Sequence, residues 1–203
     1  MNPDETFGYD VDPDEAVSDP IGLLRSWLAR CDGSVTPLMT LSTIDEDGYP
    51  DSRHVLLSRC DAEGRIAFHT DARSRKAAQL RAIPRASVAV VWPGLARQLV
   101  VTGDVGEEDP SDQTDAYGRR PRYLQLLAWL NDEDTAGAVL AQRREAWASF
   151  DAGRAQLAAP PTWLGRLLTP RRIVFWRGEA DAPSNRVLCT RTDAGWSVVR
   201  RPG

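Results

Sequence analysis

Cysteine, histidine and lysine are all scarce in this sequence of 203 residues. Cys31, Cys60 and Cys189 stand far apart, with neither the spacing of a metal site nor that of a disulfide framework, so they suit a reducing cytoplasm. His54 and His69 are too few for most histidine-based metal sites. We therefore expect neither a bound metal nor a disulfide network.

Long apolar runs and an excess of positive charge are also missing. No segment approaches the roughly 20 apolar residues of a membrane span, and no signal peptide opens the chain. A net charge of −4 argues against a general binder of nucleic acid or anionic membranes. The composition, 42% hydrophobic and 27% charged, is that of an ordinary globular protein. We expect a cytoplasmic protein whose partners include no nucleic acid and no membrane.

The chain divides into a short arm and one domain. Residues 1–19 are rich in Asp, Glu and Pro with little to bury, which predicts a mobile acidic arm. Residues 20–203 are enough for a single domain with a real core. Asp19 is the expected N-cap of a first helix over 20–31, with Pro20 at its first position.

Most of the remaining pattern is that of short strands joined by tight turns. The strands are expected near 38–44, 55–57, 66–70, 87–92, 98–105, 173–176, 187–192 and 196–200. Helices are expected over 74–82 and over much of 109–152, with a break near Pro121, and residues 154–169 are expected to be a proline-rich connection. Because the helices are grouped rather than alternating with strands, the pattern favours a β-rich α+β fold: an antiparallel barrel with flanking helices.

The one lysine, Lys76, stands beside Arg75 at the expected start of the helix over 74–82. Arg53 would reach the same place from a neighbouring strand. Free N–H groups and the positive end of a helix already favour phosphate there. The cluster therefore predicts a compact phosphate site, and the alternative is a solvated basic helix start.

Seven sequence motifs in the same order resemble those of the pyridoxamine 5′-phosphate oxidase family. They comprise residues 37–57, 68–77, 97–103, 120–129, 175–176, 185–186 and 196–202. The resemblance runs from about residue 20 to the end. It implies a split β-barrel that binds flavin mononucleotide (FMN) at the interface of a homodimer.

The resemblance also assigns the cofactor contacts. Arg53, Thr70, Arg75 and Lys76 would hold the phosphate and ribityl chain, and the backbone of residues 53–58 would run along the flavin. Other contacts, partly from the second subunit, would complete the flavin site. The remaining implied cofactor residues are His54, Val55, Leu56, Ser58, His69, Gln98, Glu133, Asp134, Trp176 and Arg186.

The substrate side departs from the family pattern. Ser58 replaces a lysine that grips the substrate phosphate, Leu124 replaces a serine, and Ala182 and Ser184 stand where an Arg and a His clamp the substrate ring. Arg120 is retained, and Tyr117 lies near the expected tyrosine. The implied substrate residues are thus Ser58, Tyr117, Arg120, Leu124, Ala182 and Ser184. These changes indicate a flatter, less anionic substrate than pyridoxine phosphate.

The resemblance implies an FMN-dependent oxidase that takes a hydride from a C–N or dihydro-heterocyclic small molecule and uses dioxygen to form hydrogen peroxide. A specialised metabolite is the expected substrate, as for phenazine-pathway relatives. Two alternatives stay open: a pyridoxine/pyridoxamine 5′-phosphate oxidase, and a deazaflavin- or haem-binding split-barrel protein. No catalytic side chain is assigned, since the flavin carries the chemistry. His69 is expected to pack or contact flavin, and Trp163 to fill the core or the dimer interface.

Overall fold

A computed structural model describes residues 17–29 and 38–203. The expected arm over 1–19 lies outside the described residues except for its last three. The strands are β1 (Leu38–Ile44), β2 (Pro50–Leu56), β3 (Arg59–Cys60), β4 (Ile66–Asp71), β5 (Arg85–Trp92), β6 (Arg97–Glu107), β7 (Trp163–Arg177), β8 (Asn185–Thr192) and β9 (Gly195–Pro202). The helices are α1 (Pro20–Ala29), α2 (Arg75–Ala82), α3 (Pro110–Gly118), α4 (Arg122–Leu130), α5 (Glu133–Gly137) and α6 (Leu140–Asp151), with a 3₁₀ turn over Pro93–Leu95.

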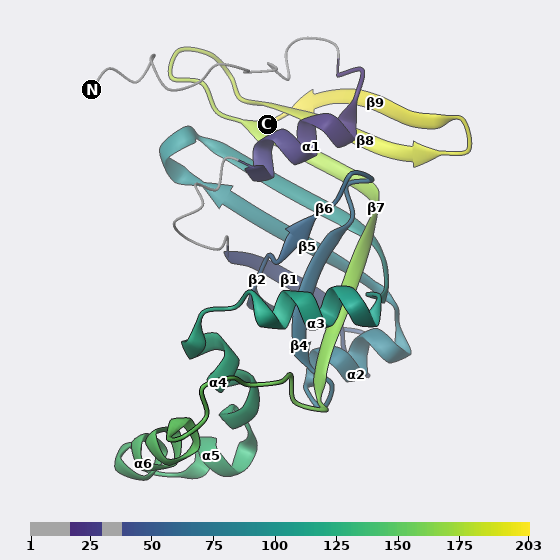
Figure 1. Cartoon of the computed structure of the whole chain (residues 1–203). Helices are drawn as coiled ribbons and strands as arrows, with labels where there is room; N and C mark the ends of the chain where they lie inside the picture. The colour runs from purple at the N-terminus through teal and green to yellow at the C-terminus, as the bar shows by residue number, and fades with distance from the viewer. Residues whose placement is uncertain (1–16, 30–37) are drawn as a thin grey trace.

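The described strands form one antiparallel sheet that curls into a half-barrel (Figure 1), which confirms the expected split-barrel fold. Its central path runs β2-β1-β5-β6-β7-β4-β3. The long strand β7 pairs with β6 along most of its length, with β4 through its first half and with β8 through its second half. The sheet therefore divides at β7, where β8 and β9 diverge from β4 and β3.

A glycine on β6 accommodates an irregularity in the pairing of β6 with β7. The register between β6 and β7 shifts between Thr102 and Gly103. A Cβ at Gly103 would lie 1.9 Å from the carbonyl oxygen of Thr169 and 3.2 Å from the Cα of Pro170. Only a residue without a side chain fits this close approach of two backbones, as is common at bulges.

The core lies inside the curl and is capped by α1. Alternate residues of β1, β5 and β6 are buried, as the period of two in a strand requires. Trp27 of α1 packs edge-on against Phe175, with ring centroids 5.2 Å apart. Asp19 caps α1 as expected, since its Oδ1 accepts a hydrogen bond from Gly22 N at 2.9 Å.

The segment between β6 and β7 contains the helices α3 to α6. In Figure 1, α3 lies across the sheet while α4, α5 and α6 gather beyond its lower end. The predicted break at Pro121 is confirmed, because α3 ends at Gly118 and α4 begins at Arg122. The prediction of an irregular connection over 154–169 is wrong from Trp163 onward. Those residues pair with β4, a long-range contact that the local proline content does not reveal.

The remaining differences are small. The two-residue strand β3 was not expected, and α2 begins at Arg75 with Ser74 as its N-cap. None of the helices in the described parts of the chain is long and apolar enough to cross a membrane.

Candidate functional site

Arg53 is held in place by a network on its own sheet. It lies on β2, and its Nη1 donates to Thr43 Oγ1 at 2.6 Å and to Leu41 O at 3.3 Å. Its Nη2 donates to Gln79 Oε1 at 3.0 Å and lies 2.7 Å from Asp51 Oδ2. The guanidinium group is thus fixed in orientation before any ligand arrives.

Asp51 brings a second arginine to the same point. Its Oδ2 lies 2.8 Å from Arg75 Nη2 and accepts a hydrogen bond from Gln79 Nε2 at 2.9 Å. The Gln79 hydrogen bond, together with Arg53 and Arg75, lowers the pKa of Asp51. Arg53 and Arg75 therefore converge on one carboxylate instead of pointing away from each other.

Lys76 completes the cation cluster from the first turn of α2. Its Nζ donates to Thr70 Oγ1 at 3.0 Å, and Thr70 Oγ1 lies 3.1 Å from Ser74 Oγ. Burial first, and then the positive charge of Arg53, lower the pKa of Lys76. Asp71 also lies near Lys76, but it is paired with Arg73 at 2.6 Å. Among the described residues, Arg53, Arg75 and Lys76 then face Asp51 with a surplus of positive charge, which suits a phosphate dianion.

A cavity of about 330 Å³ opens beside these groups. Its walls come from β2, β4, α2 and α4, together with residues that precede α4 and β7. Among the residues expected to bind cofactor or substrate, it is lined by Arg53, His54, Val55, Leu56, His69, Thr70, Lys76, Arg120 and Leu124. His54 is exposed at its rim, and its Nδ1 lies 3.2 Å from Thr40 Oγ1.

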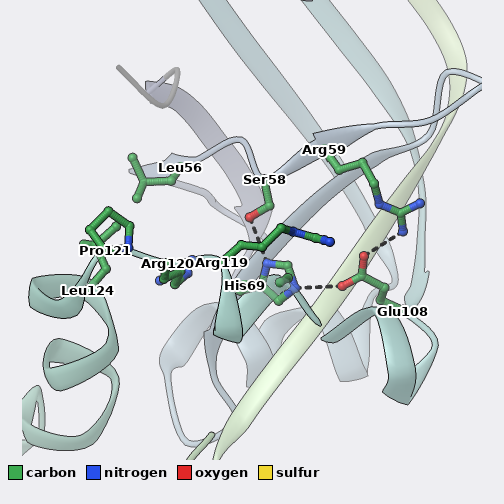
Figure 2. Close-up of a pocket in the computed structure, with 10 residues that line it drawn as sticks. Leu56, Ser58, Arg59, His69, Glu108, Arg119, Arg120, Pro121 and Leu124 are labelled. Carbon is green, nitrogen blue, oxygen red and sulfur yellow. Dashed lines mark hydrogen bonds and ion pairs between the residues drawn. The ribbon is translucent and has the colours of Figure 1, made fainter. Parts of the chain in front are cut away.

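A second, smaller cavity of about 130 Å³, whose lining residues are drawn in Figure 2, adjoins the first. Leu56, His69, Arg120 and Leu124 line both cavities. The further lining residues of the second cavity are Ser58, Arg59, Glu108, Ala116, Arg119 and Pro121. The expected phosphate site and three expected substrate residues therefore adjoin one another within a single chain.

Ser58, His69 and Glu108 form a chain of polar contacts that runs from the exposed Ser58 to the buried Glu108 along the second cavity. Ser58 Oγ lies 2.8 Å from His69 Nδ1, and His69 Nε2 lies 2.7 Å from Glu108 Oε2 (Figure 2). The side chains of His69 and Glu108 are 0% and 2% exposed. The second contact is an ion-pair distance with a bent geometry, since neither Nε2 nor Oε2 forms a regular hydrogen bond within the described residues.

Trp163 and Arg59 support this chain from two sides. The indole of Trp163 is stacked on the His69 ring, with centroids 4.8 Å apart and planes 8° from parallel. Arg59 Nη2 lies 2.8 Å from both Glu108 Oε1 and Asp112 Oδ2. Burial outweighs the nearby carboxylate and lowers the pKa of His69, which favours the neutral imidazole at pH 7.

Arg120 brings a positive charge to both cavities. Its guanidinium lies over the Trp163 ring, 4.4 Å from the centroid, and burial lowers its pKa. Tyr117, by contrast, is 2% exposed, and its hydroxyl donates to Gln125 O and accepts from Trp129 Nε1, both at 3.1 Å. Tyr117 lines neither cavity of the described structure and holds α3 against α4.

The other expected site residues lie elsewhere. Arg75, Glu133 and Asp134 line an adjoining cavity of about 600 Å³ between α2 and α5. Gln98, Trp176 and Arg186 form a row across β6, β7 and β8, since Gln98 pairs with Trp176 and Trp176 with Arg186. Within the described residues, none of that row lines the first two cavities. Ala182 and Ser184 lie on the loop between β7 and β8.

Sequence reasoning missed several residues of the site. The period of two on β2 places Asp51 on the same face as Arg53, and that signal was available. Gln79 is one turn of α2 beyond Lys76, which is a weaker signal. Glu108 comes from beyond the end of β6, and nothing local connects it with His69. Trp163 was expected in the core or the dimer interface, and it lines the first cavity instead.

Comparison with known proteins agrees with this geometry. A family model described as pyridoxamine 5′-phosphate oxidase matches residues 34–157. A pyridoxine/pyridoxamine 5′-phosphate oxidase from Caulobacter vibrioides is 35% identical over 189 residues, which are 90% of this chain and 84% of that protein. The protein of the same name from Anaeromyxobacter dehalogenans is 37% identical over 195 residues, which are 92% and 96%.

Two solved structures share the fold. PhzG from Burkholderia lata, in complex with tetrahydrophenazine-1-carboxylic acid, has a TM-score of 0.81 at 24% identity, over 96% of this chain and 98% of that one. A pyridoxamine 5′-phosphate oxidase-related, FMN-binding protein from Nostoc punctiforme has a TM-score of 0.72 at 21% identity, over 96% and 100%.

Proposed function

Because the chain belongs to the pyridoxamine 5′-phosphate oxidase family, we propose that it is an FMN-dependent oxidase of a small molecule other than pyridoxine 5′-phosphate. One observation carries the proposal. The cation-lined cavity that suits a phosphate shares the wall of Leu56, His69, Arg120 and Leu124 with a second cavity. A cofactor anchored in the first would thus face a substrate in the second.

The residues of the first cavity fit FMN. Arg53 and Lys76 of this cavity, with Arg75 beside it through Asp51, would neutralise the phosphate dianion, and Thr70 and Ser74 would offer it hydroxyl groups. Residues of β2 from Arg53 to Leu56 would line the path of the ring system. Once bound, the flavin supplies a two-electron acceptor that dioxygen reoxidises to give hydrogen peroxide.

The second cavity suits a substrate with an acidic group, since Arg119 and Arg120 line it. Arg120 offers a guanidinium that within the described residues has no carboxylate in ion-pair contact, and Leu124 adds an apolar wall. Ser58, where the family has a phosphate-binding lysine, is engaged with His69. A flat heterocycle from specialised metabolism, bearing a carboxylate, matches these walls better than a phosphate ester.

A homodimer would complete the flavin site. Gln98 and Arg186 are exposed on the sheet surface and lie in register with Trp176. We place this row against the flavin of a second copy, where a guanidinium and an amide would hydrogen-bond the polar edge of the ring. We also propose that residues 20–203 act as one domain, in the cytoplasm.

A pyridoxine/pyridoxamine 5′-phosphate oxidase is the second candidate. The names of relatives that are 35% and 37% identical favour it. Arg119 and Arg120 both line the second cavity and would serve a substrate phosphate in place of the lost lysine.

Purification followed by a peroxide assay separates the candidates. We expect a yellow protein that releases FMN on denaturation, forms peroxide with tetrahydrophenazine-1-carboxylic acid, and does not turn over pyridoxine or pyridoxamine 5′-phosphate. Efficient turnover of either vitamer would establish the second candidate. A colourless protein that does not bind added FMN would refute both.

A further inference from the structure

We propose that Ser58, His69 and Glu108 form a proton relay in which Ser58 Oγ takes the proton from a substrate N–H or O–H while the adjacent carbon loses its hydride. The inference rests on the proposed oxidase function and adds a base to it. Ser58 and His69 would act on the substrate directly or through one hydrogen bond, and Glu108 would act as a positioning residue.

The direction of the relay follows from the contacts of the imidazole. Glu108 Oε2 lies 2.7 Å from His69 Nε2 and Glu108 also contacts Arg59, so we assign the ring proton to Nε2, where it faces a carboxylate that accepts. In the other tautomer, the Nε2 lone pair would face the carboxylate and repel it. A neutral ring with Nε2–H has an accepting Nδ1, to which the Ser58 hydroxyl donates at 2.8 Å.

The groups around His69 leave its ring unprotonated at rest and thus free to accept a proton during the reaction. The charged groups that face it are Glu108, Arg120 and Arg59. The two arginines and burial disfavour protonation in the resting state, whereas Glu108 stabilises the imidazolium that forms. Stacking on Trp163 and the Arg59 contact to Glu108 fix both partners in orientation.

Protons and electrons balance in the proposed step. A substrate H–C–X–H, where X is nitrogen or oxygen, loses a hydride with its electron pair to the oxidised flavin and becomes C=X. The proton on X passes to Ser58 Oγ as Ser58 gives its own proton to His69 Nδ1. The proton leaves when dioxygen takes two electrons and two protons to form hydrogen peroxide, which restores the flavin.

The two ring nitrogens of His69 have the reverse of the partners that they have in a serine hydrolase. In a Ser-His-Asp triad the serine bonds Nε2 and the carboxylate bonds Nδ1. Here Ser58 meets Nδ1 and Glu108 meets Nε2. Proton transfer from Ser58 to His69 needs their hydrogen bond and the nearby charge of Glu108, and no covalent intermediate.

The first test is nitrogen NMR of the flavin-loaded protein labelled with ¹⁵N-histidine. The chain has two histidines, so His54→Gln assigns the signals. We expect His69 to be neutral at pH 7 with its proton on Nε2, Ser58→Ala to shift the Nδ1 signal, and Glu108→Gln to shift the Nε2 signal. A proton on Nδ1, or signals that neither variant moves, would overturn the relay.

The second test is the pH profile of turnover with tetrahydrophenazine-1-carboxylic acid and with pyridoxine 5′-phosphate. General base catalysis contributes roughly 10²- to 10⁴-fold. We expect His69→Phe, which keeps an aromatic ring on Trp163, and Ser58→Ala to lower kcat by about 100-fold or more with little change in KM. Both variants should also lose the acid limb of the profile. A raised KM with unchanged kcat would show that Ser58 and His69 bind the substrate without transferring its proton, and would overturn the relay.

Asp112→Asn is the matched control. It removes an Arg59 ion pair of the same 2.8 Å length as the one to Glu108, but Asp112 has no contact with His69 in the described structure. We expect Glu108→Gln to lower kcat and Asp112→Asn to leave both kcat and the NMR signals unchanged. If the wild-type protein forms no peroxide with either compound, neither compound is its substrate and the proposed function fails. The NMR result still decides, independently, whether the relay exists.

Discussion

Replacing Lys76 with methionine tests the phosphate site at its most specific residue. The change keeps the length of the side chain and removes the ammonium that donates to Thr70 Oγ1 at 3.0 Å. A charge-assisted hydrogen bond contributes roughly 1.5–3 kcal/mol, and each 1.4 kcal/mol is tenfold in affinity. We therefore expect the Kd for FMN to rise about 10- to 150-fold.

The same substitution should not weaken the protein without its cofactor. Burial and the nearby Arg53 lower the pKa of Lys76, so the folded apoprotein disfavours its charge relative to the unfolded chain. At pH 7 the apoprotein of Lys76→Met should then be at least as stable as wild type. Only the stabilisation that added FMN confers should shrink.

The assay is titration of apoprotein with FMN, followed by quenching of flavin fluorescence, alongside thermal unfolding with and without FMN. Arg65→Met is the control, because Arg65 is paired with Asp61 at 2.7 Å and neither residue lines the first cavity. We expect its Kd to stay near the wild-type value. Equal affinities for wild type and Lys76→Met, or equal losses in both variants, would refute the assignment of Lys76 to the phosphate.

Three further predictions concern the fold and its buried groups. Gly103→Ala should lower the free energy of unfolding by about 1–3 kcal/mol or more in urea titrations, because its Cβ would clash with a backbone carbonyl 1.9 Å away, whereas Gly106→Ala has nothing within 4 Å to meet. The pKa of His69 is lowered from 6.5, chiefly by burial, so the unfolded chain binds its proton first and wild-type stability should fall as pH drops below 6.5. In His69→Phe the free energy of unfolding should no longer fall in this way with pH. If it still does, other groups cause the pH dependence. Burial raises the pKa of Cys60 and Cys189 to about 11, so both thiols should resist iodoacetamide at pH 8 until the protein is unfolded, as mass spectrometry of the labelled peptides would report.

Local patterns were sufficient for most of the fold. The period of two in β1 and β5 and the glycine turns marked the strands, and Asp19 with Pro20 marked the start of α1. The beginning of β7 at Trp163 was missed because its pairing with β4 joins residues about ninety positions apart. Proline-rich sequence around it favours a loop, and long-range pairing overrides that preference.

In the candidate site, too, local sequence placed some residues, whereas long-range contacts bring in the others. Arg53 and Lys76 were placed together from sequence, since a strand and a helix start supply them within a short stretch, and the family resemblance added Thr70. The link between His69 and Glu108 was not foreseen, because a carboxylate beyond the end of β6 carries no local sign of its partner. Tyr117 was expected at the substrate, yet its hydroxyl is fully engaged between α3 and α4.

The affinity of the apoprotein for FMN relative to riboflavin tests the central claim most directly, because the two ligands differ only in the phosphate. Loss of at least two charge-assisted contacts costs about 3 kcal/mol or more, so FMN should bind at least about 100-fold more tightly. Equal Kd values for FMN and riboflavin would contradict a phosphate held by Arg53, Arg75 and Lys76.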